Sequence, residues 1–289
     1  MSTCRRGIMM ERIMKTLDIG GRQVPQLGQG TWNIGDSAAS RATEIAALRR
    51  GVELGMTVID TAEMYGSGRS EILVGEAIDG LSERVQLVSK VLPSNASLEG
   101  TAKACEASLK RLRVETIDLY LLHWPGRFPL RDTVAAFHRL LEQGKIRAWG
   151  VSNFDVDDME ELFHVPGGNA CAVNQVLYNP ENRGIEFDLL PWCEQNKVTV
   201  MAYSPVGQGG RLLDSKALRG IAEKHRVSPA QVALAWCLRR AVLAIPKAGS
   251  IQHVEENVAA AGLELDAEDL AEIEKGYPGP KRKQGLDML

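Results

Sequence analysis

The sequence alternates short apolar stretches with longer amphipathic segments, and this alternation limits the folds that it can adopt. The short stretches hold four to six residues and are rich in Val, Ile and Leu. They lack the polar alternation of a strand that has one face in water, so we expect a parallel sheet covered by helices. Eight such units in 289 residues favour an α/β fold of the closed (β/α)8 TIM barrel type.

The predicted elements cover nearly the whole chain. The eight strands are expected at residues 27–30, 57–60, 85–90, 117–122, 146–151, 170–175, 198–203 and 242–245. The helices are expected near residues 41–54, 70–79, 99–113, 131–143, 156–164, 186–196, 214–225, 229–239, 251–261 and 267–275. Adjacent Gly20 and Gly21 within residues 15–24 predict an N-terminal β-hairpin.

A doubly wound open sheet is the alternative fold. It is disfavoured because no G-x-G-x-x-G follows the first predicted strand. No Pro/Gly/Ser-rich linker or change of composition divides the chain either. We therefore predict a poorly ordered tail at residues 1–14 and a single barrel domain over residues 15–289.

Composition and charge exclude several classes of function. A net charge of -3 gives no basic surface for nucleic acid or for an anionic membrane. No apolar run reaches the ~18 to 20 residues that span a bilayer, and the N-terminus lacks the apolar segment of a secretory signal. The five cysteines are scattered and form no C-x-x-C. This usage indicates a reduced, cytoplasmic protein without a disulfide framework or zinc site.

Polar side chains stand at the ends of seven predicted strands. In a barrel, these ends meet on one face, where substrates bind. The residues are Asp60, Lys90, His123, Asn153, Gln175, Tyr203 and Lys247. Their successive intervals of 30, 33, 30, 22, 28 and 44 residues follow the strand repeat, which is about 30 residues per unit, except at the last step. We therefore expect them to form the floor of one active site.

The loop after residue 60 brings an acid and a phenol together. Tyr65 follows Asp60 in a Gly-rich loop, and Ser70 is the predicted cap of the next helix. A phenol has a reference pKa of about 10, and a neighbouring ammonium such as Lys90 lowers it. A buried Lys90 needs the counter-charge of Asp60, and a neutral His123 can orient a substrate oxygen. The set suits reduction of a carbonyl, where hydride reaches carbon and oxygen needs a proton.

Two other chemistries have weaker support in the residues. No stretch of sequence offers three or four metal ligands, and Ser204 lacks the context of a nucleophile elbow. A metal-dependent barrel enzyme remains an alternative, although it requires more carboxylates and histidines at the strand ends than Asp60 and His123.

Taken in order, these residues resemble the aldo-keto reductase family. The matching stretches are Gly30-Thr31-Trp32, Ile59-Asp60-Thr61-Ala62 through Tyr65-Gly66, Ser89-Lys90, Asp118 through His123-Trp124-Pro125, Gly150-Val151-Ser152-Asn153-Phe154, Asn174-Gln175, Ala202-Tyr203-Ser204-Pro205, and Ile245-Pro246-Lys247 through Glu256-Asn257. The resemblance covers about residues 16 to 275 and implies the same barrel. It also implies that Asp60, Tyr65, Lys90 and His123 are catalytic, with Tyr65 as proton donor.

The resemblance further implies binding of a nicotinamide cofactor. Ser152, Asn153 and Gln175 are expected to hold the carboxamide, Tyr203 to stack on the ring, and loop 204–210 to cover the pyrophosphate. The full set of implied cofactor residues is Gly30, Thr31, Trp32, Asp60, Ser152, Asn153, Gln175, Tyr203, Ser204, Pro205, Val206, Gly207, Gln208, Gly209, Ile245, Pro246, Lys247, Ala248, Gly249, Ser250, His253, Glu256 and Asn257.

The last motif departs from the family pattern for NADPH. Ala248 and His253 stand where a Ser and an Arg are usual, while Lys247 and Ser250 can still contact a 2′-phosphate. We expect NADPH, with NADH possible, and expect any contribution of His253 to fade above neutrality because a histidine loses its charge there.

The substrate is expected to be a small aldehyde or ketone, including 2-oxoaldehydes such as methylglyoxal. Trp32, Asn33 and Trp124, with Tyr65 and His123, are expected to wall its pocket. We expect a monomer, leaving a weak dimer open. A cofactor-binding regulatory subunit of the same fold is the alternative, which the intact set of four catalytic residues disfavours.

Overall fold

The structure is a computed structural model that describes residues 14–289, so most of the predicted tail lies outside the described residues. Its centre is an eight-stranded sheet in the order β10-β9-β8-β7-β6-β5-β4-β3. The strands are β3 (Gln29–Gly30), β4 (Val58–Asp60), β5 (Gln86–Val91), β6 (Ile117–Leu122), β7 (Ile146–Ser152), β8 (Val173–Leu177), β9 (Thr199–Tyr203) and β10 (Val242–Ala244). All neighbours in this sheet pair in parallel. The eight predicted strands are confirmed.

The sheet closes into a barrel between its first and last strands. Parallel bridges join Leu27 to Ala244 and Gly30 to Lys247. Gly30 permits this approach, because a Cβ there would lie 2.7 Å from the carbonyl oxygen of Ile245. The predicted (β/α)8 barrel is therefore confirmed.

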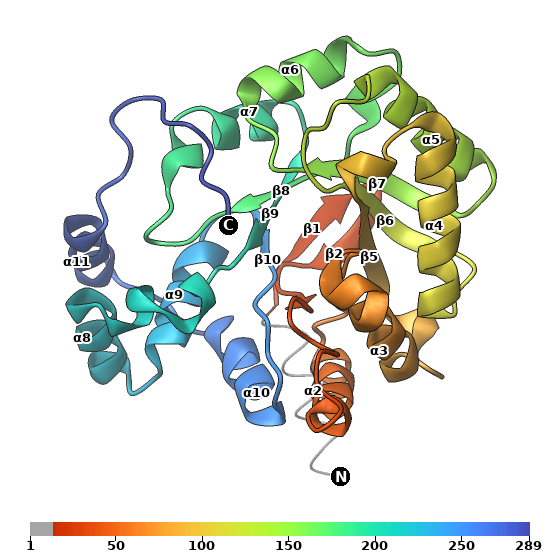
Figure 1. Cartoon of the computed structure of the whole chain (residues 1–289). Coiled ribbons are helices and arrows are strands. Elements are labelled where there is room, and N and C mark those ends of the chain that lie inside the picture. Colours follow the sequence, from red (N-terminus) through yellow and green to blue (C-terminus); the bar gives the residue numbers. More distant parts are fainter. Residues whose placement is uncertain (1–13) are drawn as a thin grey trace.

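Helices form a ring around the barrel (Figure 1). They are α2 (Arg41–Glu53), α3 (Arg69–Ala77), α4 (Leu98–Leu112), α5 (Leu130–Glu142), α6 (Val156–His164), α7 (Leu189–Gln195), α8 (Lys216–His225), α9 (Pro229–Leu238), α10 (Ile251–Ala260) and α11 (Ala267–Gly276). The helix predicted at 186–196 starts later, at Leu189, because residues 184–186 form a 3-10 turn.

The predicted cap of the helix near residues 70–79 is wrong. Helix α3 begins after Gly68, whose φ of +89° ends the preceding turn, so Ser70 lies inside the helix. The Ser70 hydroxyl instead donates to Thr31 Oγ1 at 2.8 Å. Ser70 thus joins the loop after β3 to the helix that follows Tyr65.

The apolar core has two layers, which follow from the alternation of side chains along each strand. Leu119 and Leu121 of β6 point into the barrel, where they pack with Val58 and Val88. Tyr120 and Leu122 of the same strand pack outward against the helices, as do most buried apolar residues. Alternate positions of every strand are therefore available to the barrel interior.

The N-terminal hairpin is confirmed as β1 (Thr16–Ile19) and β2 (Arg22–Pro25). Gly20 and Gly21 both have positive φ in its turn. Ile19 and Val24 pack into the interior cluster, and Thr199 Oγ1 donates to the carbonyl of Asp18 at 3.0 Å. The hairpin therefore closes the end of the barrel at which the strands begin.

The hydrophobicity of the helices and the burial of the cysteines are described for residues 14–289 only. Within residues 14–289, no helix has the length and apolar character needed to cross a membrane. Cys105, Cys171, Cys193 and Cys237 are free and buried, as expected, and burial raises the pKa of the Cys105 thiol to about 12. Cys4 lies outside the described residues.

Candidate active site

The strand register places an ion pair inside the barrel mouth. Asp60 pairs with Val88 on the next strand, and Val58 and Val88 both point inward. The side-chain period of two then turns Asp60 and Lys90 inward as well, at the carboxyl ends of β4 and β5. Lys90 is fully buried and Asp60 is 2% exposed.

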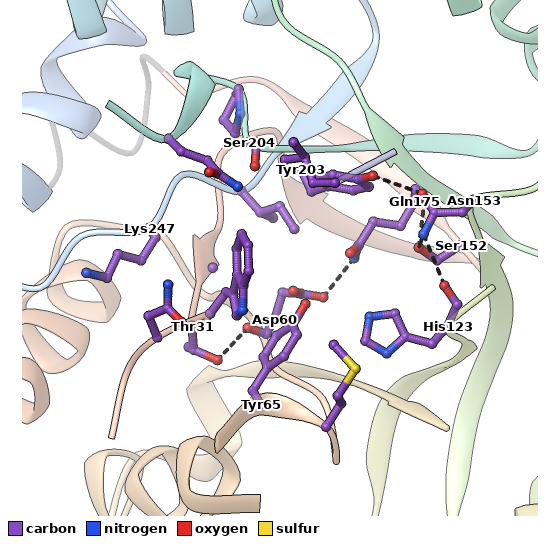
Figure 2. A pocket seen from close by; sticks show the side chains of 18 of the residues that line it. Thr31, Asp60, Tyr65, His123, Ser152, Asn153, Gln175, Tyr203, Ser204 and Lys247 are labelled. Carbon is purple, nitrogen blue, oxygen red and sulfur yellow. Dashed lines mark hydrogen bonds between the residues drawn. The ribbon is translucent and has the colours of Figure 1, made fainter. Parts of the chain in front are cut away.

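Lys90 makes three hydrogen bonds that join the predicted catalytic groups. Its Nζ donates to Asp60 Oδ2 at 2.8 Å, to the carbonyl of Thr61 at 2.9 Å and to the hydroxyl of Tyr65 at 3.1 Å. The other Asp60 oxygen accepts from Gln175 Nε2 at 2.7 Å, across the barrel (Figure 2). Asp60, Lys90 and Tyr65 thus form one connected cluster, as the sequence predicts.

The pKa values keep this cluster in defined protonation states. Burial alone lowers the pKa of Lys90, but Asp60 and Tyr65 outweigh burial, so the net pKa is raised and the ammonium persists. Burial raises the pKa of Tyr65, Lys90 lowers it and Asp60 raises it, with a net rise. Lys90 thus lowers the pKa of Tyr65, as expected, but burial of the phenol exceeds this effect. Tyr65 holds its proton at neutral pH.

His123 lies beside the phenol in its neutral form. The rings of Tyr65 and His123 are 5.8 Å apart and nearly perpendicular. Burial, with a smaller effect of Lys90, lowers the pKa of His123 to about 3. Its Nδ1 is buried without a hydrogen-bond partner. The expected neutral imidazole is confirmed, and it can hydrogen-bond a substrate oxygen without carrying charge.

The lowered pKa of His123 has a consequence for stability. An unfolded histidine has a pKa of about 6.5, so between pH 6.5 and 3 the unfolded chain binds a proton that the folded chain excludes. Stability is then lost as pH falls through this window, by about 2 kcal/mol at pH 5. We expect His123→Gln to remove this loss, measured as urea unfolding free energies at pH 5 and 7.5. Equal pH dependence in both proteins would contradict the assignment.

A second group of polar residues faces this cluster. Tyr203 donates from its hydroxyl to Asn153 Oδ1 at 3.0 Å, and Asn153 Nδ2 donates to the carbonyl of His123 at 3.1 Å. Ser152 Oγ donates to the carbonyl of Gln175 at 2.8 Å. Asn153 has a φ of +59°, a left-handed conformation that Asn tolerates better than most residues. Hydrogen bonds therefore fix the expected carboxamide site relative to His123 (Figure 2).

These residues line a cavity of about 270 Å³ at the barrel mouth. The predicted site residues that line it are Gly30, Thr31, Trp32, Asn33, Asp60, Tyr65, His123, Trp124, Ser152, Asn153, Gln175, Tyr203, Ser204, Pro205, Val206, Gln208, Ile245 and Lys247. The predicted residues outside its lining are Lys90, Gly207, Gly209, Pro246, Ala248, Gly249, Ser250, His253, Glu256 and Asn257. Of these, Lys90 is hydrogen-bonded to the hydroxyl of Tyr65. Cofactor contacts for the others stay predictions.

Three lining residues are missing from the sequence analysis. Met64 precedes Tyr65 in the same loop, and its position beside a predicted catalytic residue was the available signal. Met288 and Leu289 come from the end of the chain, far from any strand. Their only signal is that two apolar residues follow a polar, basic segment.

The described residues suit a nicotinamide dinucleotide. Tyr203 offers an aromatic wall beside the amides of Asn153 and Gln175. Lys247 is exposed on the side of the cavity away from His123 and makes no ion pair within residues 14–289 (Figure 2). Ser250 caps α10 nearby, so a helix N-terminus adds donors for an anion. An unpaired cation beside a helix N-terminus fits a phosphate group.

Metal ligands are not gathered in the part of the chain that is described. No group of three or more His, Cys, Asp or Glu side chains there is arranged to hold a metal ion. The donors at the mouth are instead suited to moving a proton and holding an organic ligand.

The mouth of this (β/α)8 barrel holds a protonated phenol that is hydrogen-bonded to a buried Lys–Asp pair, and these are groups that acid-base chemistry requires. The chain belongs to the aldo/keto reductase family, whose family model matches residues 26–277. The protein is therefore an oxidoreductase.

Sequence similarity to known proteins extends over nearly the whole chain. The chain is 54% identical to methylglyoxal reductase YeaE of Escherichia coli (strain K12), over 93% of this chain and 97% of that protein. It is 36% identical to glyoxal reductase of Bacillus subtilis (strain 168), over 88% of this chain and 89% of the relative. A crystal structure of an aldo/keto reductase from Klebsiella pneumoniae, in complex with NADP and acetate, has a TM-score of 0.93 and 50% identity. That match covers 96% of this chain and all of the other.

Proposed function

We propose that the protein reduces aldehydes and ketones to alcohols with NADPH, and that methylglyoxal and related 2-oxoaldehydes are among its substrates. The observation that carries the proposal is the Lys90 ammonium, hydrogen-bonded to both Asp60 and the Tyr65 hydroxyl at the floor of the cavity. The E. coli relative at 54% identity, a methylglyoxal reductase, supports the substrate class. The NADP complex of the Klebsiella structure supports the cofactor.

The residues divide the reaction between them. When bound, the reduced nicotinamide supplies hydride to the carbonyl carbon. Tyr65 donates its proton to the carbonyl oxygen, and the resulting phenolate is stabilised by Lys90 at 3.1 Å. Neutral His123 hydrogen-bonds the same oxygen and orients it. Asp60 keeps Lys90 charged, so the phenolate always forms beside a cation.

Binding of the cofactor follows from the residues on the opposite wall. Ser152, Asn153 and Gln175 hold the carboxamide, and the Tyr203 ring covers the nicotinamide. Lys247 and the N-terminus of α10 hold the 2′-phosphate, which distinguishes NADPH from NADH. The protein acts as a monomer in the cytoplasm, where its buried free cysteines stay reduced.

Loss of NADPH absorbance with methylglyoxal and a panel of small aldehydes tests the function. We expect turnover with NADPH and less with NADH at equal concentration. Tight NADPH binding without turnover of any carbonyl would instead favour the regulatory subunit.

Lys247→Met tests the basis of the cofactor preference. Because Lys247 is exposed and unpaired within the described residues, its loss should leave the fold intact. We expect KM for NADPH to rise about tenfold, with KM for NADH unchanged, since a charge-assisted contact to phosphate is lost. Equal rises for both cofactors would remove Lys247 from the 2′-phosphate site. Lys281→Met, on the exposed C-terminal segment, is the control.

A further inference from the structure

The chain after α11 returns to the barrel mouth. Residues 278–289 leave the ring of helices and run back toward the barrel centre (Figure 1). At their end, Met288 and Leu289 line the cavity that also holds Tyr65 and His123. A segment with no helix or strand of its own therefore forms part of the wall of the active site.

The start of this segment has a buried anchor. Arg183, in the loop after β8, is 8% exposed and donates to Glu274 Oε2 at 2.7 Å and to the carbonyl of Tyr277. Glu274 Oε1 in turn accepts from the backbone N–H of Gly279 at 2.9 Å. The chain is thus fixed as far as residue 279.

The middle of the segment is held mainly by one side chain. Lys283 Nζ lies 3.2 Å from Asp157 Oδ1, 3.8 Å from Asp155 Oδ2 and 3.7 Å from Asp188 Oδ2. Asp155 caps α6 and Asp188 caps α7, each through its Oδ1. Their Oδ2 atoms remain for Lys283. We call these four residues the Lys283 clasp.

Few other contacts fix the residues beyond the clasp. Asn182 Nδ2 donates to Asp287 Oδ2 at 3.2 Å, Leu286 packs against the core, and the Leu289 backbone N–H donates to the Tyr203 hydroxyl. Because Lys283 is 43% exposed, its ion pairs are individually weak and sensitive to salt. A segment with so few contacts opens locally when one of them is lost.

Large apolar side chains gather where the segment meets the mouth. Trp32 is 43% exposed, Met64 41% and Met288 52%, and all three line the cavity with Leu289. Apolar groups that remain in water together around a cavity indicate an apolar ligand group. Methionine side chains also adapt to ligands of different shape.

We propose that Lys283 is a positioning residue for substrate selectivity. Through the clasp it holds residues 284–289 against the mouth, where Met288 and Leu289 contact the apolar part of carbonyl substrates larger than methylglyoxal. The inference rests on the proposed function and extends it to aldehydes with longer apolar chains. Small carbonyls are bound by Tyr65 and His123 at the floor and do not need the segment.

Hexanal and propanal measure this selectivity, because they share one reacting group and differ only in apolar length. At saturating NADPH, we expect Lys283→Ala to lower the ratio of kcat/KM for hexanal to that for propanal about fivefold, through KM for hexanal. Lys283→Arg should restore the ratio. Arg282→Ala removes the same charge from an exposed neighbour that has no ion pair within residues 14–289, and should leave the ratio unchanged.

Hydrogen exchange tests the clasp without any turnover. We expect faster exchange of backbone amides 284–289 in Lys283→Ala than in Arg282→Ala, with the rest of the chain unchanged. The proposal would be overturned if Lys283→Ala left hydrogen exchange unaltered, or if its preference for hexanal were unaltered or higher. It would also be overturned if the wild-type enzyme reduced methylglyoxal but not hexanal. Faster exchange in a protein that reduces no carbonyl would instead leave the clasp standing and overturn both the selectivity role and the proposed function.

Discussion

Tyr65→Phe is expected to lower kcat about 10²- to 10⁴-fold, the usual contribution of a positioned proton donor. The substitution removes only the hydroxyl that accepts from Lys90 Nζ, and it keeps the ring beside His123. Within residues 14–289, Tyr65 supplies the only hydroxyl that is hydrogen-bonded to Lys90, so we expect no other hydroxyl there to take over the proton transfer. The measurement is single-turnover NADPH oxidation with methylglyoxal.

Two controls separate loss of the acid from loss of the site. NADPH affinity, measured by fluorescence titration, should stay within about twofold of wild type, since the cofactor residues are untouched. Tyr277→Phe removes a phenol hydroxyl away from the cavity and should keep full activity. A Tyr65→Phe enzyme as fast as wild type would mean that the proton comes from elsewhere.

Lys90→Met is expected to reduce both activity and stability. It leaves the Asp60 carboxylate, 2% exposed, with Gln175 as its remaining side-chain donor. An unpaired buried charge costs about 3–5 kcal/mol, so the free energy of unfolding should fall by that amount. Activity should fall as well, because the phenolate of Tyr65 loses its cation.

The double variant Asp60→Asn with Lys90→Met distinguishes the two effects. Removing both charges eliminates the uncompensated carboxylate, so urea unfolding should recover most of the lost stability. Activity should stay low, since the phenolate of Tyr65 does not regain its cation. Lys90→Met with wild-type stability would show that Asp60 is not buried as a charge.

The sequence predicted the parts of the site that depend on strand periodicity. Asp60, Lys90 and His123 lie at or within one residue of the ends of three successive strands. The alternation of side chains turns them inward without any long-range information. Lys247 lies at the closure beside Gly30 for the same reason. The barrel itself follows from eight apolar strands that have no solvent face.

Features that depend on distant packing were not predictable in this way. The net rise in the Tyr65 pKa depends on how completely the phenol is buried, which no local pattern encodes. Ser70 has the character of a helix cap, but the left-handed Gly68 starts the helix earlier. Met288 reaches the cavity because Lys283 meets carboxylates from two other helices, a pairing without sequence periodicity.

The closure of the barrel also bears on how the enzyme is made. The bridges Leu27 to Ala244 and Gly30 to Lys247 join the first strand to the last. During synthesis β3 is made early and β10 late. The pairing of β3 with its second neighbour is therefore possible only after β10 has been synthesised. Lys247 meets Gly30 only at that final step. If Lys247 contacts the cofactor as proposed, nucleotide binding is expected only after the first and last strands of the barrel have paired.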